Sequence, residues 1–116
     1  MGADIQKLQV AVRRFAEERE WQQFHTPKNL ATSISIEAAE LLEHFQWLTD
    51  AQSAEPPEEH REEIGNEVAD VLIYLLRLCD RLGIDPVEAA WRKLDINAKK
   101  YPADLARGSI RKYTEL

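Results

Sequence analysis

The segment from Glu58 to Leu82 constrains the fold more than any other part of the sequence. Pro56 and Pro57 exclude helix immediately before it, and Gly83 follows it as a residue suited to capping a helix C-terminus. Between these boundaries, apolar residues recur near the 3.6-residue period, which predicts one long helix. The apolar arc of this helix is wide, so we expect it to be covered on more than one side.

The other long segments share this period, and none alternates polar and apolar residues as a half-buried strand would. We expect a first helix over about residues 4–20 and a second over about 29–49, separated by Pro27. A fourth helix begins with Asp85 as N-cap and ends before "YPADLARGS", and "DAQSAEPPEE" is predicted to be a loop. The prediction is an all-α, four-helix bundle with a C-terminal arm, in one domain over residues 1–116.

Length, charge and cysteine content exclude several classes of protein. The chain has 116 residues, the length of one domain, and a chain this short often gains burial by forming oligomers. Its formal net charge of −6 argues against non-specific nucleic-acid binding. One cysteine cannot form an internal disulfide, and we find no signal-like segment or membrane-spanning run. We therefore expect a cytoplasmic protein that binds neither nucleic acid nor membrane.

Paired carboxylates border the apolar faces of the second and third predicted helices. Glu67 and Asp70 lie one turn apart beside the most apolar run of the chain, and Glu37 and Glu40 repeat this spacing on the second helix. Carboxylates beside a core are costly unless something satisfies them. Antiparallel packing of the two helices would bring all four groups to one point.

A hard divalent cation would neutralise such a cluster, and Mg²⁺ commonly bridges carboxylates to substrate phosphates. We therefore predict Glu37, Glu40, Glu67 and Asp70 as Mg²⁺ ligands, with Glu40 as our choice of general base. Solvated acids on helix flanks are the ordinary alternative. A di-iron centre is a second alternative, but it requires Glu-x-x-His motifs, which this sequence lacks.

Aromatic and imidazole groups accompany the acidic stripes. Flat rings beside a metal–phosphate centre suit a nucleobase, which offers a π face for stacking, although large aromatic residues are also common in cores. We interpret His44 and His60 as surface or structural residues. The candidates for substrate binding in this group are Trp21, Phe24, His25, Trp47 and Tyr74.

The C-terminal quarter of the chain is basic. Lys93, Asn97 and Lys100 follow i, i+4, i+7 spacing, so one face of the fourth helix presents two cations and an amide. A triphosphate carries more charge than one Mg²⁺ neutralises, and cationic side chains are the usual complement. These three residues are therefore further candidates for substrate binding, and a solvated charged tail is the alternative.

The third helix also carries apolar residues beyond its main stripe. Ile73 and Leu76 lie outside the predicted core face, and exposed apolar area of this kind marks an interface. We expect these two residues to lie between subunits. The predicted core face consists of Ile64, Val68, Val71, Leu72, Leu75, Leu78 and Cys79.

Several of these segments carry a resemblance to a known family. "EAAELLEHFQW" followed by "EVADVLIYL" resembles the acidic motifs of the MazG-like, all-α nucleoside triphosphate pyrophosphohydrolases. "EREWQQFHTPKNL", "KLDINAKKYP" and "LARGSIRKYTEL" resemble the dCTP pyrophosphatase branch of that family. The likeness runs from about Asp4 to Leu116. It implies that Mg²⁺ is bound by Glu37, Glu40, Glu67 and Asp70.

The resemblance also implies a reaction and an assembly. A nucleoside triphosphate, dCTP or a base-modified relative, would be split into monophosphate and pyrophosphate in nucleotide-pool house-cleaning. The enzyme would be a homotetramer, a dimer of dimers, with the Trp21–His25 segment, Trp47 and Tyr74 lining the base and sugar pocket. Val12 stands where that branch has a histidine. A non-catalytic binding or antitoxin-like module of the same fold is the alternative, and the intact set of four acids favours the enzyme.

Overall fold

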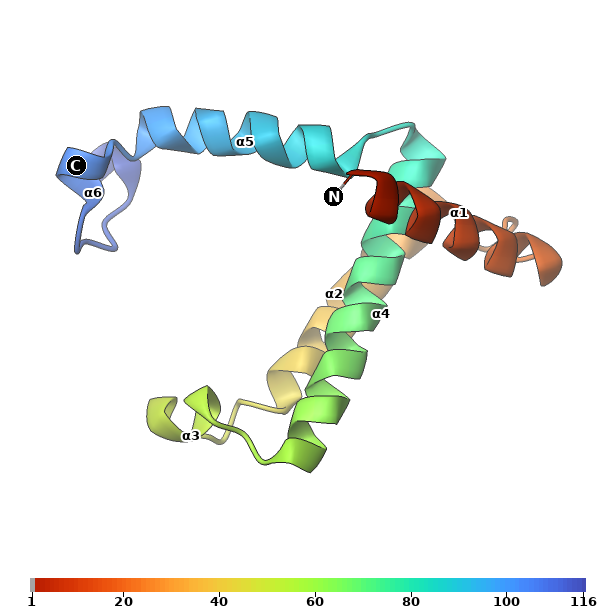
Figure 1. Cartoon of the computed structure of the whole chain (residues 1–116), viewed down its shortest axis with the longest axis horizontal. Helices are drawn as coiled ribbons and strands as arrows, with labels where there is room; N and C mark the ends of the chain where they lie inside the picture. The colour runs from red at the N-terminus through yellow and green to blue at the C-terminus, as the bar shows by residue number, and fades with distance from the viewer. Residues whose placement is uncertain (1) are drawn as a thin grey trace. The chain divides into compact units, whose positions relative to one another are not determined.

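The computed structural model describes residues 2–116, which contain helices and turns but no strand (Figure 1). The all-α prediction is therefore confirmed for this range. The helices are α1 (Gly2–Glu18), α2 (Pro27–Glu43), α3 (Asp50–Ala54), α4 (Glu58–Leu82), α5 (Pro86–Lys100), α6 (Ala103–Ala106) and the 3-10 helix η1 (Tyr113–Glu115).

The chain divides into two compact units, Met1–Ile84 and Asp85–Leu116. The first contains α1 to α4, and the second contains α5, α6 and η1. The single domain over residues 1–116 stays a prediction. Among the described residues, none of the helices has both the length and the apolar character that a membrane span requires.

Helix α4 organises the first unit. Helix α2 runs antiparallel to α4 and packs along it, as the predicted convergence of the acids requires (Figure 1). Helix α1 packs on α4 near its C-terminal end, where the Gln9 side chain donates to the Leu76 carbonyl at 3.2 Å. The fully buried apolar residues come one from each of these helices: Ala16, Leu30 and Leu76.

We predicted that Leu76 lies outside the core face of α4, between subunits. This prediction was wrong, because Leu76 is only 2% exposed and belongs to the core. The predicted core face is instead partly open, because Val68, Leu72 and Leu75 are 50%, 38% and 42% exposed. These three residues, which we call the α4 apolar stripe, share one side of the helix at i, i+4, i+7 spacing. Within the first unit, helices α1 and α2 pack on α4 and leave this stripe exposed.

The turn that follows α1 places the aromatic linker. The Trp21 amide donates to the Ala16 carbonyl at 2.9 Å and the Glu20 amide to the Glu17 carbonyl at 3.0 Å, which is the Schellman pattern of a helix C-terminus. Glu20 has a positive φ of 55°, a conformation that glycine usually adopts. The reversal brings the Trp21 ring against Phe15, with centroids 5.7 Å apart.

Helix α2 begins close to its predicted start and ends earlier than predicted. Thr26 is the N-cap, and its side chain accepts from the Asn29 amide. The helix stops at Glu43, and the next residues form turns, so Trp47 does not lie on the helix as expected.

A short helix, α3, occupies part of the segment that was predicted to be a loop. Thr49 caps it by accepting from the Gln52 amide at 3.2 Å, while the Gln52 side chain accepts from the Thr49 amide at 3.0 Å. This reciprocal pair is a capping box, and it starts a helix of one turn before Pro56 and Pro57 stop it. The prediction of a loop was therefore wrong for Asp50–Ala54.

The predicted boundaries of the two later helices are confirmed. Gly83 ends α4 in the left-handed conformation, with φ 67°, and the Ile84 amide donates to the Cys79 carbonyl at 2.9 Å. Asp85 caps α5, because its carboxylate accepts from the amides of Val87 and Glu88 at 3.0 and 3.1 Å.

The left-handed residue at the end of α1 gives a test of this fold. Glu20→Gly should raise the free energy of unfolding by about 1 kcal/mol, because glycine adopts positive φ without the steric cost of a Cβ atom. Glu17→Gly, the same substitution within α1, should instead lower it by about 1 kcal/mol. Urea unfolding followed by circular dichroism measures both. Destabilisation of equal size in the two variants would contradict the turn described here.

Candidate functional site

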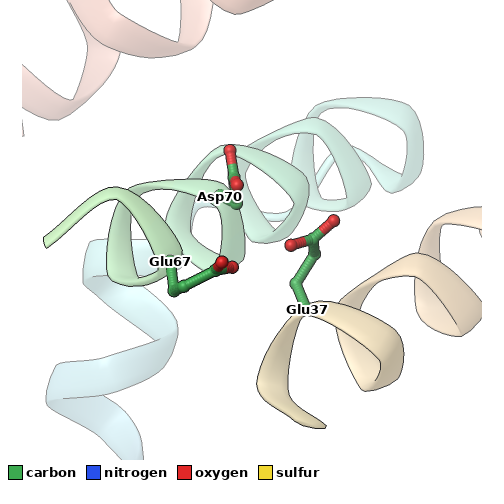
Figure 2. Close-up of side chains that lie close together, drawn as sticks. All are labelled: Glu37, Glu67 and Asp70. Atoms are coloured by element: carbon green, nitrogen blue, oxygen red, sulfur yellow. The ribbon is translucent and has the colours of Figure 1, made fainter. Parts of the chain in front are cut away.

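Three of the four predicted ligand acids converge between α2 and α4. Glu37 extends from α2 toward Glu67 and Asp70 on α4 (Figure 2). Each of the three offers a carboxylate oxygen, and these oxygens all lie within 4.8 Å of one another. The i, i+3 spacing of Glu67 and Asp70 puts both on the side of α4 that meets α2. The antiparallel packing thus does what the sequence predicted for these three groups.

Two oxygens of this acidic cluster are buried and have no protein partner. Oε2 of Glu37 and Oε2 of Glu67 accept no hydrogen bond from any of the described residues. A buried carboxylate oxygen without a partner costs free energy, so native proteins rarely keep one without a ligand, ion or water. Carboxylate oxygens that face one another from two helices are the kind of ligands that a hard divalent cation prefers. The residues present therefore fit such a cation.

The fourth acid, Glu40, lies one turn beyond Glu37 on α2 and is half-buried. Its carboxyl is outside the group of three that share the 4.8 Å limit, but it raises the pKa of both Glu37 and Glu67, so it acts on the cluster. Its role as a ligand and as the general base stays a prediction.

Crowding of the acids changes their protonation. Burial, the Glu40 carboxyl and the charges of Asp70 and Glu67 together raise the pKa of Glu37 to about 7. Burial and the charge of Glu40 also raise the pKa of Glu67. The cluster therefore holds protons near neutral pH when no cation is bound, and a cation would have to displace them.

A cavity of about 230 Å³ adjoins the acidic cluster, since Asp70 belongs to both. It is smaller than the roughly 300–1,000 Å³ of pockets that hold drug-sized ligands, so it suits part of a ligand, such as a base. The predicted residues that line it are Trp21, His25 and Tyr74. Val12 contributes an apolar group where the related branch was expected to have a histidine. The full lining is Val12, Phe15, Ala16, Trp21, His25, Asp70, Ile73, Tyr74 and Arg77.

Two predicted base-binding residues lie outside this lining. Phe24 is exposed, and its carbonyl accepts from the Asn29 side chain at 3.0 Å. Trp47 is 87% exposed in the turn after α2. Their predicted contacts with a substrate stay predictions. His44, which we expected to be structural, is the C-cap of α2.

The basic candidates all lie on α5 in the second unit. Lys93 and Lys100 are exposed and Asn97 is half-buried, in agreement with one face at i, i+4, i+7 spacing. The Lys100 ammonium lies 4.9 Å from the centroid of the Tyr113 ring. Phosphate binding by these three residues stays a prediction.

Sequence reasoning missed a buried arginine of the cavity. Arg77 is 3% exposed and lines the cavity with Tyr74 and Asp70. The signal was present, because Glu67, Asp70, Tyr74 and Arg77 follow i, i+3, i+7, i+10 and thus form one stripe on α4. An arginine inside the apolar "LLRL" run is seldom buried without a partner.

Comparison with known proteins identifies a family and a similar solved structure. The sequence model of the MazG-like family matches residues 32–116. The crystal structure of a pyrophosphatase from Archaeoglobus fulgidus is similar, with a TM-score of 0.81 and 50% sequence identity. The match covers 85% of this chain and 93% of that one.

Curated relatives are also similar over nearly the whole chain. The proteins named dCTP pyrophosphatase 1 from Homo sapiens and Mus musculus are 46% and 44% identical to it over 115 and 116 residues. Each match covers 97% of this chain and 66% of the relative. The chain thus spans slightly less than two thirds of the length of these relatives.

The raised pKa of Glu37 predicts how pH affects the metal-free protein. Between the ordinary value of 4.5 and about 7, the folded state binds more protons than the unfolded state, so stability falls as pH rises through this range. Glu37→Gln removes the titrating group. The variant and the wild type should unfold alike near about pH 5, and the variant should be the more stable near about pH 8. Urea unfolding in EDTA measures this difference.

Glu62→Gln is the matched control, because Glu62 is an exposed glutamate of α4 outside the acidic cluster. Glu62→Gln should lack the gain in stability that Glu37→Gln shows near about pH 8. Saturating Mg²⁺ should reduce or reverse the advantage of Glu37→Gln, since a cation that binds only the folded state stabilises it. An advantage of Glu37→Gln that is constant across this pH range would contradict the buried, crowded carboxyl.

Proposed function

The chain belongs to the MazG-like family, and on that basis we propose that it is a Mg²⁺-dependent nucleoside triphosphate diphosphatase. We further propose that it converts dCTP, or a base-modified relative of dCTP, to the monophosphate and pyrophosphate. The observation that carries the proposal is the convergence of Glu37, Glu67 and Asp70, with unpartnered buried oxygens, beside a base-sized cavity. The names of the curated relatives and of the similar crystal structure support the reaction class and substrate.

In this proposal the acidic cluster holds the cation. Glu37 on α2 and Glu67 and Asp70 on α4 would bind Mg²⁺, with Glu40 as the fourth ligand. When bound, Mg²⁺ neutralises phosphate charge and polarises the phosphoryl oxygens. The packing of α2 on α4 fixes the carboxylates before any ligand arrives, so little reorganisation is needed.

The remaining residues bind the nucleotide and assist water. Glu40, at the edge of the cluster, would orient the attacking water and accept its proton. The Trp21 and Tyr74 rings would hold the base and sugar in the cavity. Lys93, Asn97 and Lys100 are our candidates for phosphate binding, because the exposed ammonium groups of the two lysines complement triphosphate charge and the Asn97 amide can donate hydrogen bonds.

We also propose that the protein assembles as a homotetramer, a dimer of dimers. The support is the α4 apolar stripe, whose three large side chains are left exposed by the other helices of the first unit. Apolar surface that is contiguous on a helix usually marks an interface. A second copy of the chain is the proposed partner for this surface.

The reaction is tested by identifying its products. Wild-type protein with dCTP and Mg²⁺ should release pyrophosphate and dCMP in equal amounts, as measured by enzymatic pyrophosphate detection and chromatography. Orthophosphate and dCDP as the main early products would contradict the proposed bond cleavage. Glu67→Gln should lower turnover by on the order of 100-fold or more, because the substitution removes one of the anionic carboxylates that would bind the cation. Glu62→Gln should leave turnover unchanged.

The assembly is tested on the exposed stripe. Leu72→Glu combined with Leu75→Glu should split the oligomer and lower activity, because two charges would be buried at the interface. Ala51→Glu combined with Ala54→Glu adds the same charge to exposed positions of α3 and should leave the mass unchanged. Light scattering measures both. A fully active wild-type monomer at micromolar concentration would contradict the assembly.

A further inference from the structure

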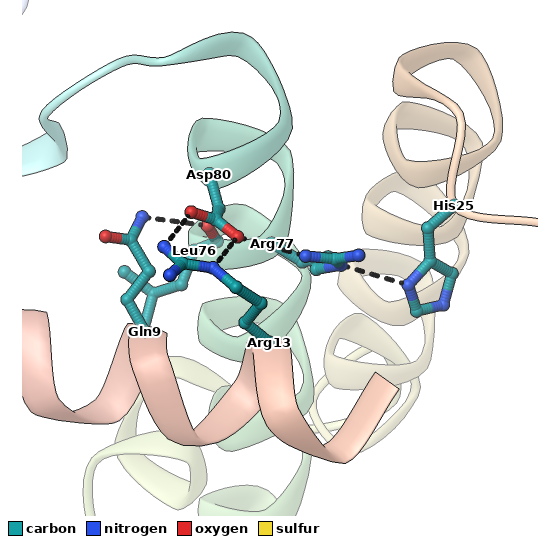
Figure 3. A network of polar contacts seen from close by, with 6 residues as sticks. All are labelled: Gln9, Arg13, His25, Leu76, Arg77 and Asp80. Atoms are coloured by element: carbon teal, nitrogen blue, oxygen red, sulfur yellow. Dashed lines mark hydrogen bonds and ion pairs between the residues drawn. The ribbon is translucent and has the colours of Figure 1, made fainter. Parts of the chain in front are cut away.

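A buried arginine connects the cavity to a polar network at the C-terminal end of α4 (Figure 3). The Arg77 Nε–H group donates to Nδ1 of His25 at 3.2 Å, and Nη1 donates to Oδ2 of Asp80 at 3.0 Å. The side chain is 3% exposed, so these bonds are shielded from water. Arg77 therefore has two fixed partners, one in the turn before α2 and one on its own helix.

Helix α1 restrains Asp80, the carboxylate to which Arg77 donates. Arg13 donates from Nε to Oδ2 of Asp80 at 2.8 Å and makes a second contact from Nη2 to Oδ1 (Figure 3). This two-point contact restricts the Asp80 carboxylate in position and orientation. The hydrogen bond from Arg13 is also the main reason that the pKa of Asp80 is lowered. Asp80 thus stays ionised and restrains the Arg77 guanidinium.

The chemistry of Arg77 dictates the state of His25. A guanidinium has only donors, so Nδ1 of His25 must accept and cannot carry a proton. The imidazole is then neutral, with its proton on Nε2. Burial lowers the pKa of His25, and the charges of Arg77 and Arg81, the two cations that act on it, lower it further. Geometry and electrostatics therefore favour the same single tautomer.

His25 lines the cavity with Trp21 and Tyr74, so its Nε2–H group is the polar group that it can offer to a ligand there. We propose that Arg77 is a positioning residue for nucleotide binding, which holds His25 as a neutral Nε2–H donor to an acceptor atom of the base or sugar. The proposal rests on the proposed function for the identity of the ligand. It assigns Arg77 no direct contact with the nucleotide.

The tautomer is tested without nucleotide. Nitrogen-15 NMR of the uniformly labelled, metal-free wild type should show His25 with a protonated Nε2 and an unprotonated Nδ1 near neutral pH, with the signals assigned by comparison with His25→Gln. In Arg77→Met this single state should be replaced by a tautomer mixture. A wild-type His25 that is protonated on Nδ1 would overturn the proposal, and this result needs no variant that could misfold.

The role in binding is tested by kinetics with dCTP. Arg77→Met should raise KM about tenfold, which corresponds to the loss of about one hydrogen bond to the nucleotide. The kcat should stay within about twofold of wild type. The matched control is Arg61→Met, the same substitution at an exposed position of α4, which should leave KM within about twofold of wild type.

A double variant shows whether Arg77 acts through His25. His25→Ala should raise KM as Arg77→Met does, and the double variant should be no worse than His25→Ala alone. Independent, multiplying effects would overturn the proposal, because Arg77 would then contact the nucleotide directly. A wild type that fails to hydrolyse dCTP would contradict the proposed function, while the NMR result would still decide the state of His25.

Discussion

The approach of Glu37 on α2 to Glu67 on α4 is the interaction on which the rest of the site depends. Packing the two helices antiparallel buries one oxygen of each carboxylate with no protein partner. The pKa of both acids rises as a result, with burial as the first cause and crowding by neighbouring acids as the second. This arrangement destabilises the empty protein, and a bound cation would turn the same oxygens into ligands.

One stripe of α4 carries both acids of the cluster and side chains of the adjoining cavity. Glu67 and Asp70 supply acids, Tyr74 supplies a ring, and Arg77 supplies a buried cation one turn further along. The side chains along this stripe thus change from acidic to basic, and Asp70, Tyr74 and Arg77 line one cavity. A ligand that places metal-bound phosphate at one end and a base at the other would match this order, and a nucleoside triphosphate is such a ligand.

Much of this could be predicted from the sequence. Helical period and capping residues indicated α4 and α5, and i, i+3 spacing brought Glu67 and Asp70 to one side of a helix. Period alone does not say which side of a helix is covered, so Leu76 was predicted outside the core and Leu75 within it. The Thr49–Gln52 capping box was overlooked, and Arg77 gained its meaning only from contacts with residues distant in sequence.

If the acids between α2 and α4 bind a divalent cation, anomalous diffraction from crystals soaked in Mn²⁺ should locate it. Mn²⁺ takes the oxygen ligands that Mg²⁺ takes and scatters anomalously. One or more anomalous peaks should lie within coordination distance of Glu37, Glu67 and Asp70, and the peak should be lost in Glu67→Gln crystals. Peaks only at other carboxylates, with the Glu37 and Glu67 oxygens left unligated, would contradict cation binding by these acids.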